Sequence, residues 1–192
     1  MTVTPSRDVI DELIDDHEEA RDLLTQIHVT AEPDRRRELA DVLIAGLVRH
    51  SVAEETVTYP VFRKYLPNGD EIVEHDIEEH KELELALRDL ESSDPANGDF
   101  DSCVARVQKV LLHHVEGEEE HQFPELRAVV PPEQLESMAG KVDAIKRVAP
   151  TRPHPSAPNS PLFHVVAGPG VGLVDRLKDR LSDRPTTTED LT

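Results

Sequence analysis

The sequence contains an internal repeat with a spacing of about 64 residues, and this repeat constrains the fold more than any other feature. The segment HSVAEETVTYP, which begins at His50, aligns without a gap with HVEGEEEHQFP, which begins at His114. Upstream, His17 precedes His50 by 33 residues, and His80 precedes His114 by 34 residues. The chain is therefore predicted to contain two similar units, each with a lone His followed by a His-x-x-x-Glu pair.

Apolar residues recur with a period near 3.6 in four long segments, which predicts four amphipathic helices. Proline and glycine separate the segments, at Pro33, at Pro67-Asn68-Gly69, at SSDPANGD and at Pro131-Pro132. The predicted helices run from about 8 to 28, from 34 to 66, from about 70 to 91 and from 100 to 129, with a shorter fifth helix from 132 to 148. Long helices joined by short loops are typical of an all-α, up-down-up-down four-helix bundle, which we expect to occupy residues 1–148.

Residues 149–192 differ in character from the rest of the chain. The stretch PTRPHPSAPNSP has five prolines in twelve residues, so it predicts an extended linker. Leu173, Leu177 and Leu181 follow at a spacing of four, which indicates a short amphipathic helix that is too weak to be stable alone. The sequence leaves open whether this helix packs on the bundle or binds a protein partner.

Charge and cysteine content exclude several classes of function. The formal net charge is -19, from 40 acidic and 21 basic side chains, so neither nucleic acid nor an anionic membrane is an expected partner. No apolar run approaches the roughly 18 residues of a membrane span, and the first residues do not resemble a signal peptide, so a cytoplasmic location is expected. Because Cys103 is the only cysteine, a transition metal would have to bind imidazole and carboxylate groups.

Six polar residues interrupt the apolar faces of the four predicted helices. They are His17, His50, Glu54, His80, His114 and Glu118. A residue and its i+4 neighbour lie on the same helix face about 6 Å apart, so each His-x-x-x-Glu pair can reach one cluster of atoms. A single His on such a face is usually a hydrogen-bonded core residue, and a single His-x-x-x-Glu is usually a surface pair. Six together would cost several kcal/mol per unpaired charge. The joint pattern therefore favours the ligand set of a non-haem di-iron or di-manganese centre.

The order H-HxxxE-H-HxxxE, with Glu-Glu and an aromatic-Pro pair after each second His, resembles the hemerythrin-like HHE cation-binding domain over roughly residues 8–148. The resemblance implies a four-helix bundle that holds two iron ions in an oxo- or hydroxo-bridged centre. It also implies that Glu54 and Glu118 bridge the irons and that the four histidines are terminal ligands.

The sequence departs from oxygen-carrying hemerythrins at the fifth histidine, which lies one turn before the third-helix ligand. Asp76 occupies that turn, and His75 lies one residue further back, rotated about 140° from the ligand face unless a π-bulge turns it inward. Such a centre would have an additional open position or a substitute ligand. Tyr59 is a candidate because its repeat partner Phe123 cannot coordinate a metal, although both rings could simply pack near their prolines.

The acidic stretch around His114 also contains His121, which lies seven residues later and about 10 Å further along the same face. Glu118-x-x-His121 superficially matches the Glu-x-x-His of ferritin-like proteins, but Val57 stands where the second copy would need its His. We expect His121 to be buried near the site rather than bound to metal. The side chains expected to face water are Glu116, Glu119, Glu120 and His113.

These observations predict a cytoplasmic metal-binding protein that binds, senses or detoxifies O2, peroxide or NO. A peroxide-decomposing, catalase-like reaction would need a proton donor near the bridge, for which Tyr59 and His121 are candidates. The alternative is a regulatory protein whose bundle reports metal or redox state to a protein partner through residues 149–192.

Overall fold

The computed structural model describes residues 7–155 and 168–191, and this part of the chain contains helices and no β-strand. Along the chain the elements are α1 (Val9–Val29), α2 (Pro33–Ala53), the π-helical turn η1 (Glu54–Thr58), α3 (Tyr59–Tyr65), α4 (Gly69–Ser92), α5 (Gly98–Gly117), the π-helical turn η2 (Glu118–Gln122), α6 (Phe123–Val129), α7 (Pro132–Lys146), α9 (Gly168–Leu181) and the 3₁₀ turn η3 (Thr188–Leu191).

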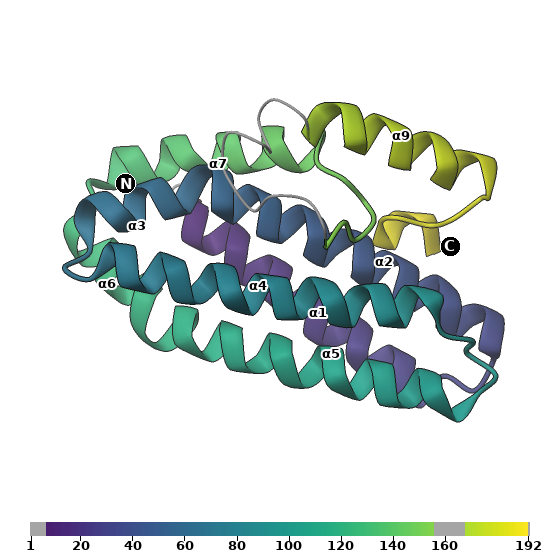
Figure 1. Cartoon of the computed structure of the whole chain (residues 1–192). Helices are drawn as coiled ribbons and strands as arrows, with labels where there is room; N and C mark the ends of the chain where they lie inside the picture. The colour runs from purple at the N-terminus through teal and green to yellow at the C-terminus, as the bar shows by residue number, and fades with distance from the viewer. Residues whose placement is uncertain (1–6, 156–167, 192) are drawn as a thin grey trace, which may run out of the picture.

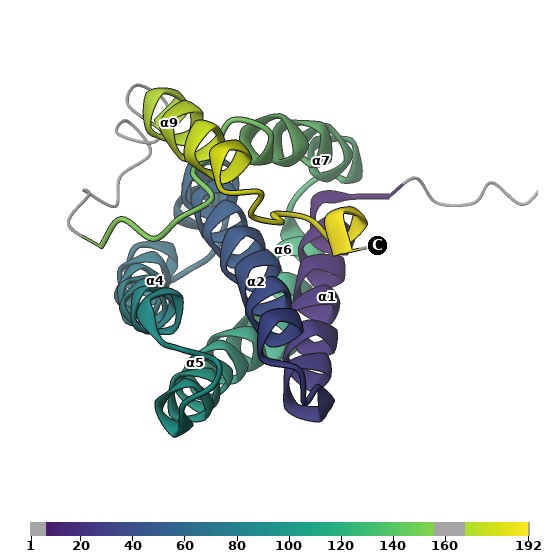
Figure 2. The same ribbon diagram turned by 90° about the vertical axis from the view of Figure 1, so that its right-hand side faces the viewer.

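The first four long helical segments form an antiparallel bundle, as the sequence predicts (Figure 1). In the end-on view the ring closes through contacts of α1 with α2, α2 with α4, α4 with α5, and α5 with α1 (Figure 2). The expected fifth helix is α7, which packs across α1 and α2. Its start agrees with the predicted one, and its end lies two residues before Val148.

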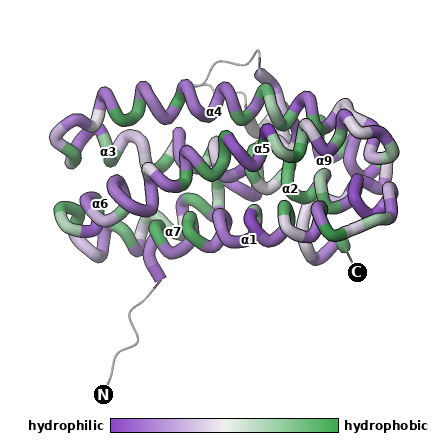
Figure 3. Tube along the Cα trace, turned by 90° about the horizontal axis from the view of Figure 1, so that it is seen from below, coloured by the Kyte–Doolittle hydropathy of each residue, from purple (hydrophilic) through white to green (hydrophobic). Residues whose placement is uncertain are grey.

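The apolar core of the bundle is divided into two clusters. One cluster includes Leu24, Leu43, Leu87 and Leu111, and the other lies toward α3, α6 and α7 and includes Phe62. The helices carry their apolar residues on inner faces and polar residues outside (Figure 3). On each long helix the break between the two clusters falls where the six polar residues are, so a polar layer crosses the middle of the core.

Two π-helical turns interrupt the second and fourth long helices, whereas the sequence predicts continuous helices from 34 to 66 and from 100 to 129. Each π turn begins at the Glu of a His-x-x-x-Glu pair and ends just before an aromatic-Pro pair. The backbone N–H groups of Tyr59 and Phe123 donate to the carbonyl oxygens five residues earlier, those of Glu54 and Glu118. A proline cannot donate to the carbonyl four residues before it, so a wider turn upstream accommodates Pro60 and Pro124. A π turn contains one residue more than an α-helical turn, and the periodicity of the sequence does not reveal this additional residue.

The C-terminal helix α9 lies on the outside of α2, beside the end of α7 (Figures 1 and 2). Its approach is close at Gly172, where a Cβ atom would lie 2.3 Å from the carbonyl oxygen of Val148. Residues 156–161 of the expected linker lie outside the described residues. Within the described ranges, no helix is both long and apolar enough to cross a bilayer.

The face of α9 that packs on the bundle is the acidic one. Asp175 and Asp179 are buried, whereas Leu173, Leu177 and Leu181 are 57–80% exposed. Asp179 forms ion pairs with Arg152 at 2.7 Å and with Arg184 at 3.2 Å. Polar contacts therefore hold α9 in place, and its apolar stripe is left on the surface.

Candidate metal centre

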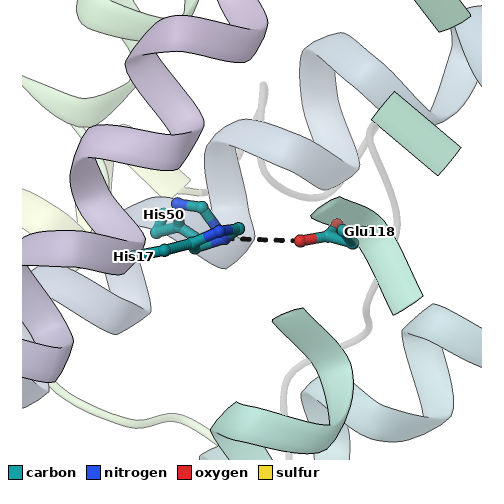
Figure 4. Close-up of side chains that lie close together, drawn as sticks. All are labelled: His17, His50 and Glu118. Carbon is teal, nitrogen blue, oxygen red and sulfur yellow. Dashed lines mark hydrogen bonds and ion pairs between the residues drawn. The ribbon is translucent and has the colours of Figure 1, made fainter. Parts of the chain in front are cut away.

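The bundle brings all six predicted site residues together at its centre. Each has at most 3% of its surface exposed: His17, His50, Glu54, His80, His114 and Glu118. Their ligand atoms form two groups, His17 with His50 and Glu118, and His80 with His114 and Glu54. Within each group the atoms lie within 4.8 Å of one another. Figure 4 shows the first group, with Glu118 facing the two imidazoles. The two groups are consistent with a binuclear metal site.

Each carboxylate reaches histidines of both groups. The Oε2 atom of Glu118 lies 3.3 Å from Nε2 of His17 and 3.5 Å from Nε2 of His114. The Oε2 atom of Glu54 lies 3.2 Å from Nε2 of His50 and 3.4 Å from Nε2 of His80. One oxygen of each carboxylate therefore lies between the two groups of histidines.

The imidazoles within each group are close neighbours. Nε2 of His17 is 3.1 Å from Nε2 of His50, and Nε2 of His80 is 3.2 Å from Nε2 of His114. All four Nε2 atoms therefore converge on the space between the two carboxylates.

A carboxylate outside the cluster fixes the orientation of every histidine through its other ring nitrogen. Nδ1 of His17 is 2.9 Å from Glu119, and Nδ1 of His80 is 3.0 Å from Glu55. Carboxylates that bind the far nitrogen of a metal-ligating His fix its tautomer and raise its basicity. With Nδ1 occupied, Nε2 is the atom presented to the centre.

The other two histidines are held in the same way by acids that precede the lone His of each repeat. Nδ1 of His50 is 2.9 Å from Asp16, and Nδ1 of His114 is 2.9 Å from Glu79. Sequence reasoning missed these contacts, although the repeat contains the signal, because both acids directly precede the lone His.

The expectation that Glu119 faces water is wrong. Besides its contact with His17, Glu119 accepts two hydrogen bonds of 3.0 Å from Arg21. Its repeat partner Glu55 is buried. In each Glu-Glu pair, the first residue, Glu54 or Glu118, therefore belongs to the cluster. The second residue, Glu55 or Glu119, contacts the outer ring nitrogen of a histidine of the cluster.

The oxygens of Glu54 and Glu118 are buried, and none of the four makes a hydrogen bond of good geometry with a described residue, although imidazole nitrogens lie 3.2 to 3.5 Å from one oxygen of each. Burial and the charge of Glu54 raise the pKa of Glu118 well above its usual value. Burial also opposes the charge of Glu54, but the surrounding imidazoles lower its pKa well below the usual range. A buried carboxylate without donors is costly unless a cation lies beside it, and imidazole with carboxylate is a donor set for transition metals.

The imidazoles are electrostatically unequal. Burial, together with the neighbouring His50, lowers the pKa of His17 to about 4. Burial also acts against the charge of His80 and His114, but nearby carboxylates raise the pKa of each to about 10. Metal binding requires neutral imidazoles, so it would displace protons chiefly from the His80 and His114 side.

Tyr59 and Phe123 cover corresponding histidines of the two repeats. The ring of Phe123 stacks on His17 with centroids 6.0 Å apart, and the ring of Tyr59 stacks on His80 at 5.6 Å. The two rings differ in that the Tyr59 hydroxyl lies 3.2 Å from Nε2 of His80. The structure thus places a hydroxyl oxygen beside His80, whereas Phe123 has none to place beside His17.

His75 and His121 lie outside the cluster. His75 is exposed, in agreement with its angle on the helix, and the π turns fall elsewhere. The expectation that His121 is buried is wrong, because its side chain is exposed. It lies within η2, where the wider π turn rotates it off the face that carries His114 and Glu118.

Comparisons with known proteins agree with this geometry. Residues 8–126 match the family model described as the hemerythrin HHE cation binding domain. The chain is 32% identical over 178 residues to an uncharacterized hemerythrin-like protein of Schizosaccharomyces pombe, covering 92% of this chain and 88% of that protein. It is 28% identical over 131 residues to a DNA nickase of Nostoc sp., covering 68% of this chain and 37% of the nickase. No solved structure matches the chain significantly. With this match and a buried His/Glu cluster in a four-helix bundle, the chain belongs to the hemerythrin HHE cation-binding domain family.

Proposed function

We propose that the buried cluster holds two iron ions and that this centre binds, senses or detoxifies a small species such as O2, peroxide or NO. Glu54 and Glu118 would bridge the two ions, and the four histidines would be terminal ligands. The observation that carries this proposal is the pair of buried carboxylates at the bundle centre, whose oxygens make no hydrogen bond of good geometry and which each lie within 3.5 Å of two imidazoles.

The chain contributes a dry, preorganised site. Apolar clusters on both sides of the polar layer exclude water from it. The outer carboxylates hold the imidazoles with Nε2 inward before any metal arrives, which lowers the cost of ordering them. An iron pair in this site would supply redox chemistry and an open coordination position for a small ligand.

Tyr59 is the residue that would distinguish one metal position from the other. Burial and the surrounding carboxylates raise the pKa of its hydroxyl well above the usual value, so without metal it holds its proton. Its distance from His80 supports a role as substitute ligand or as proton donor. His121 is exposed and is no longer a candidate donor.

Iron loading tests the proposal directly. Purified protein should carry about two irons per chain, as expected for a carboxylate-bridged bundle site. The double variant His50→Ala/His114→Ala should carry none. His28→Ala is a suitable control, because His28 is exposed and contacts Gln108 rather than the cluster. A wild-type protein that is metal-free and resists reconstitution with iron would overturn the proposal.

Two measurements separate a ligand-binding role from an enzymatic one. A stable and reversible change in the visible spectrum on exposure to O2 supports a carrier or sensor. Evolution of O2 from added peroxide supports a catalase-like enzyme. DNA nicking, named for the Nostoc relative, is not part of this proposal, because the match covers 37% of that protein and the chain carries a charge of -19.

A second candidate function is regulation through α9, and the exposed leucine stripe of this helix favours it. A protein partner would cover Leu173, Leu177 and Leu181. Replacing all three with Ser should leave metal content and stability unchanged, because the side chains are exposed, while abolishing capture of the partner. Equal capture by the variant and the wild type would contradict this function.

A further inference from the structure

The carboxylates behind the histidines differ in what lies on their outer side. Asp16 pairs with Lys146 at 2.5 Å, and Glu119 pairs with Arg21. Glu79 occupies the position of Asp16 in the second repeat, but no Lys or Arg among the described residues forms an ion pair with it. Two exposed histidines, His75 and His113, lie there instead.

These residues and Asp76 form a separate cluster on the outside of α4 and α5. Nδ1 of His75 lies 3.6 Å from Oδ1 of Asp76 and 3.7 Å from Oε2 of Glu79. Nε2 of His113 lies 3.4 Å from Oε1 of Glu79. One ligand atom from each of His75, Asp76 and Glu79 lies within 4.8 Å of the other two.

Three nitrogen–oxygen distances in this cluster are longer than hydrogen bonds and are compatible with two ligands of one metal ion. Hydrogen bonds from nitrogen to oxygen are about 2.7 to 3.2 Å long, so the contacts of His75 and His113 are too long. Two ligands about 2.1 Å from a tetrahedral ion lie about 3.4 Å apart. The observed separations of 3.4 to 3.7 Å are close to that edge length.

Asp76 is the buried member of this cluster, and its Oδ1 atom is the one that faces His75. Its side chain is 1% exposed, yet its Oδ2 atom is buried with no hydrogen-bond donor among the described residues. The other oxygen accepts a 3.1 Å hydrogen bond from Gln122 and faces His75. A buried carboxylate with an unsatisfied oxygen is stabilised by a bound cation.

We propose that His75, Asp76, Glu79 and His113 form a third, solvent-accessible site for a divalent transition metal. The side chains of His75 and His113 are 64% and 75% exposed, so water can complete the coordination. Two imidazoles and two carboxylates select Zn²⁺, Co²⁺ or Fe²⁺ over Mg²⁺ or Ca²⁺. The site shares Glu79 with His114 but does not depend on which metal the buried cluster holds.

Titration with Co²⁺ tests the site, because bound Co²⁺ gives a visible spectrum that reports its ligands. The full-length protein is first loaded with iron and freed of excess metal. The wild type should then bind one further Co²⁺ per chain, and His75→Ala/His113→Ala should bind it at least about 10-fold more weakly. The iron content of the double variant should be unchanged. His28→Ala/His121→Ala, which removes two exposed histidines elsewhere, should bind Co²⁺ like the wild type.

Two results would overturn the third site. One is a wild type that takes up no Co²⁺ beyond the buried cluster. The other is equal Co²⁺ affinity in the wild type and in His75→Ala/His113→Ala. If iron does not load at all, titration of metal-free protein still separates the two proposals. His17→Ala would then reduce uptake at the buried cluster, and His75→Ala/His113→Ala would remove the outer ion.

Discussion

The hydroxyl of Tyr59 lies 3.2 Å from Nε2 of His80, whereas the corresponding contact in the other repeat is made by Phe123, which has no hydroxyl. This oxygen is one chemical difference between the two halves of the cluster. The Phe123–His17 pair also shows that a phenyl ring fits this kind of position.

Tyr59→Phe should therefore preserve the fold and the iron content but change the spectrum of the iron-loaded protein. If Tyr59 coordinates iron, the wild type should show a phenolate-to-iron absorption band that the variant lacks. Phe123→Tyr is the reciprocal control, since it offers a hydroxyl to the other half. Identical spectra of the wild type and Tyr59→Phe would exclude Tyr59 as a ligand.

Removing Glu118, one of the two buried acids of the cluster, should stabilise the metal-free protein. Glu118 is buried and its oxygens make no hydrogen bond of good geometry with a described residue, so Glu118→Met replaces a poorly solvated carboxyl with an apolar group of similar length. We expect the free energy of unfolding of the metal-free form to rise, because burial and the charge of Glu54 both act against the Glu118 carboxylate. Urea unfolding with and without iron measures both effects, because the variant should gain no stability from iron. A metal-free variant less stable than the metal-free wild type would contradict this account.

Asp16 should matter for metal affinity although it does not reach the centre. It holds Nδ1 of His50, so Asp16→Asn weakens the orientation and basicity of that imidazole. Loss of such an outer partner costs about 10- to 100-fold in metal affinity. Competition with a chelator measures this loss. Asp15→Asn, at an exposed neighbour that pairs with Arg7, should have no effect on the affinity.

Docking of α9 should depend on pH through His154 and Asp175, which are 2.8 Å apart. The hydrogen bond to Asp175 raises the pKa of His154 above its usual value of about 6.5. This contribution is fully present below about pH 6.5 and is lost as the pH rises through the folded-state pKa. Burial opposes the charge of Asp175, but hydrogen bonds from His154 and two backbone amides lower its pKa, so its contribution is lost only in acid.

Docking of α9 should therefore be strongest between about pH 4 and 6.5. The free energy of opening of residues 168–191, from hydrogen exchange corrected for the intrinsic rate, should fall as the pH rises above about 6.5. His154→Gln should remove most of this pH dependence. The same decrease in His154→Gln would show that another group is responsible.

Gly172→Ala should weaken the docking of α9 by steric overlap. The new Cβ would lie 2.3 Å from the carbonyl oxygen of Val148 and 2.8 Å from that of Ala149, and these are backbone atoms. Overpacking of this kind costs about 1 to 3 kcal/mol. Gly170→Ala is a matched control, because a Cβ atom there would have no such neighbour within 4 Å. Hydrogen exchange in α9 should rise in the first variant and not in the second.

The sequence by itself was sufficient for the bundle and for the six central residues. Helical periodicity identifies which face of each helix is buried, and the repeat shows that His17, His50, His80 and His114 occupy equivalent places. Imidazoles and carboxylates on a buried helix face need partners such as opposite charges or a metal ion, because unpaired charges in a core are costly. These constraints are local or come from the repeat, so they can be read without coordinates.

Only the tertiary structure decided the positions that depend on contacts between segments. The π turns at Glu54 and Glu118 shift every later residue, and this shift puts His121 outside. Contacts between helices turn Glu119 toward His17 and bring Glu79 against His114 and His113. The acidic rather than the apolar face of α9 packs inward because the fold places Arg152, which is 27 residues before Asp179 in the chain, beside that carboxylate. Periodicity reports which residues share a helix face, but the partner that meets this face depends on the fold.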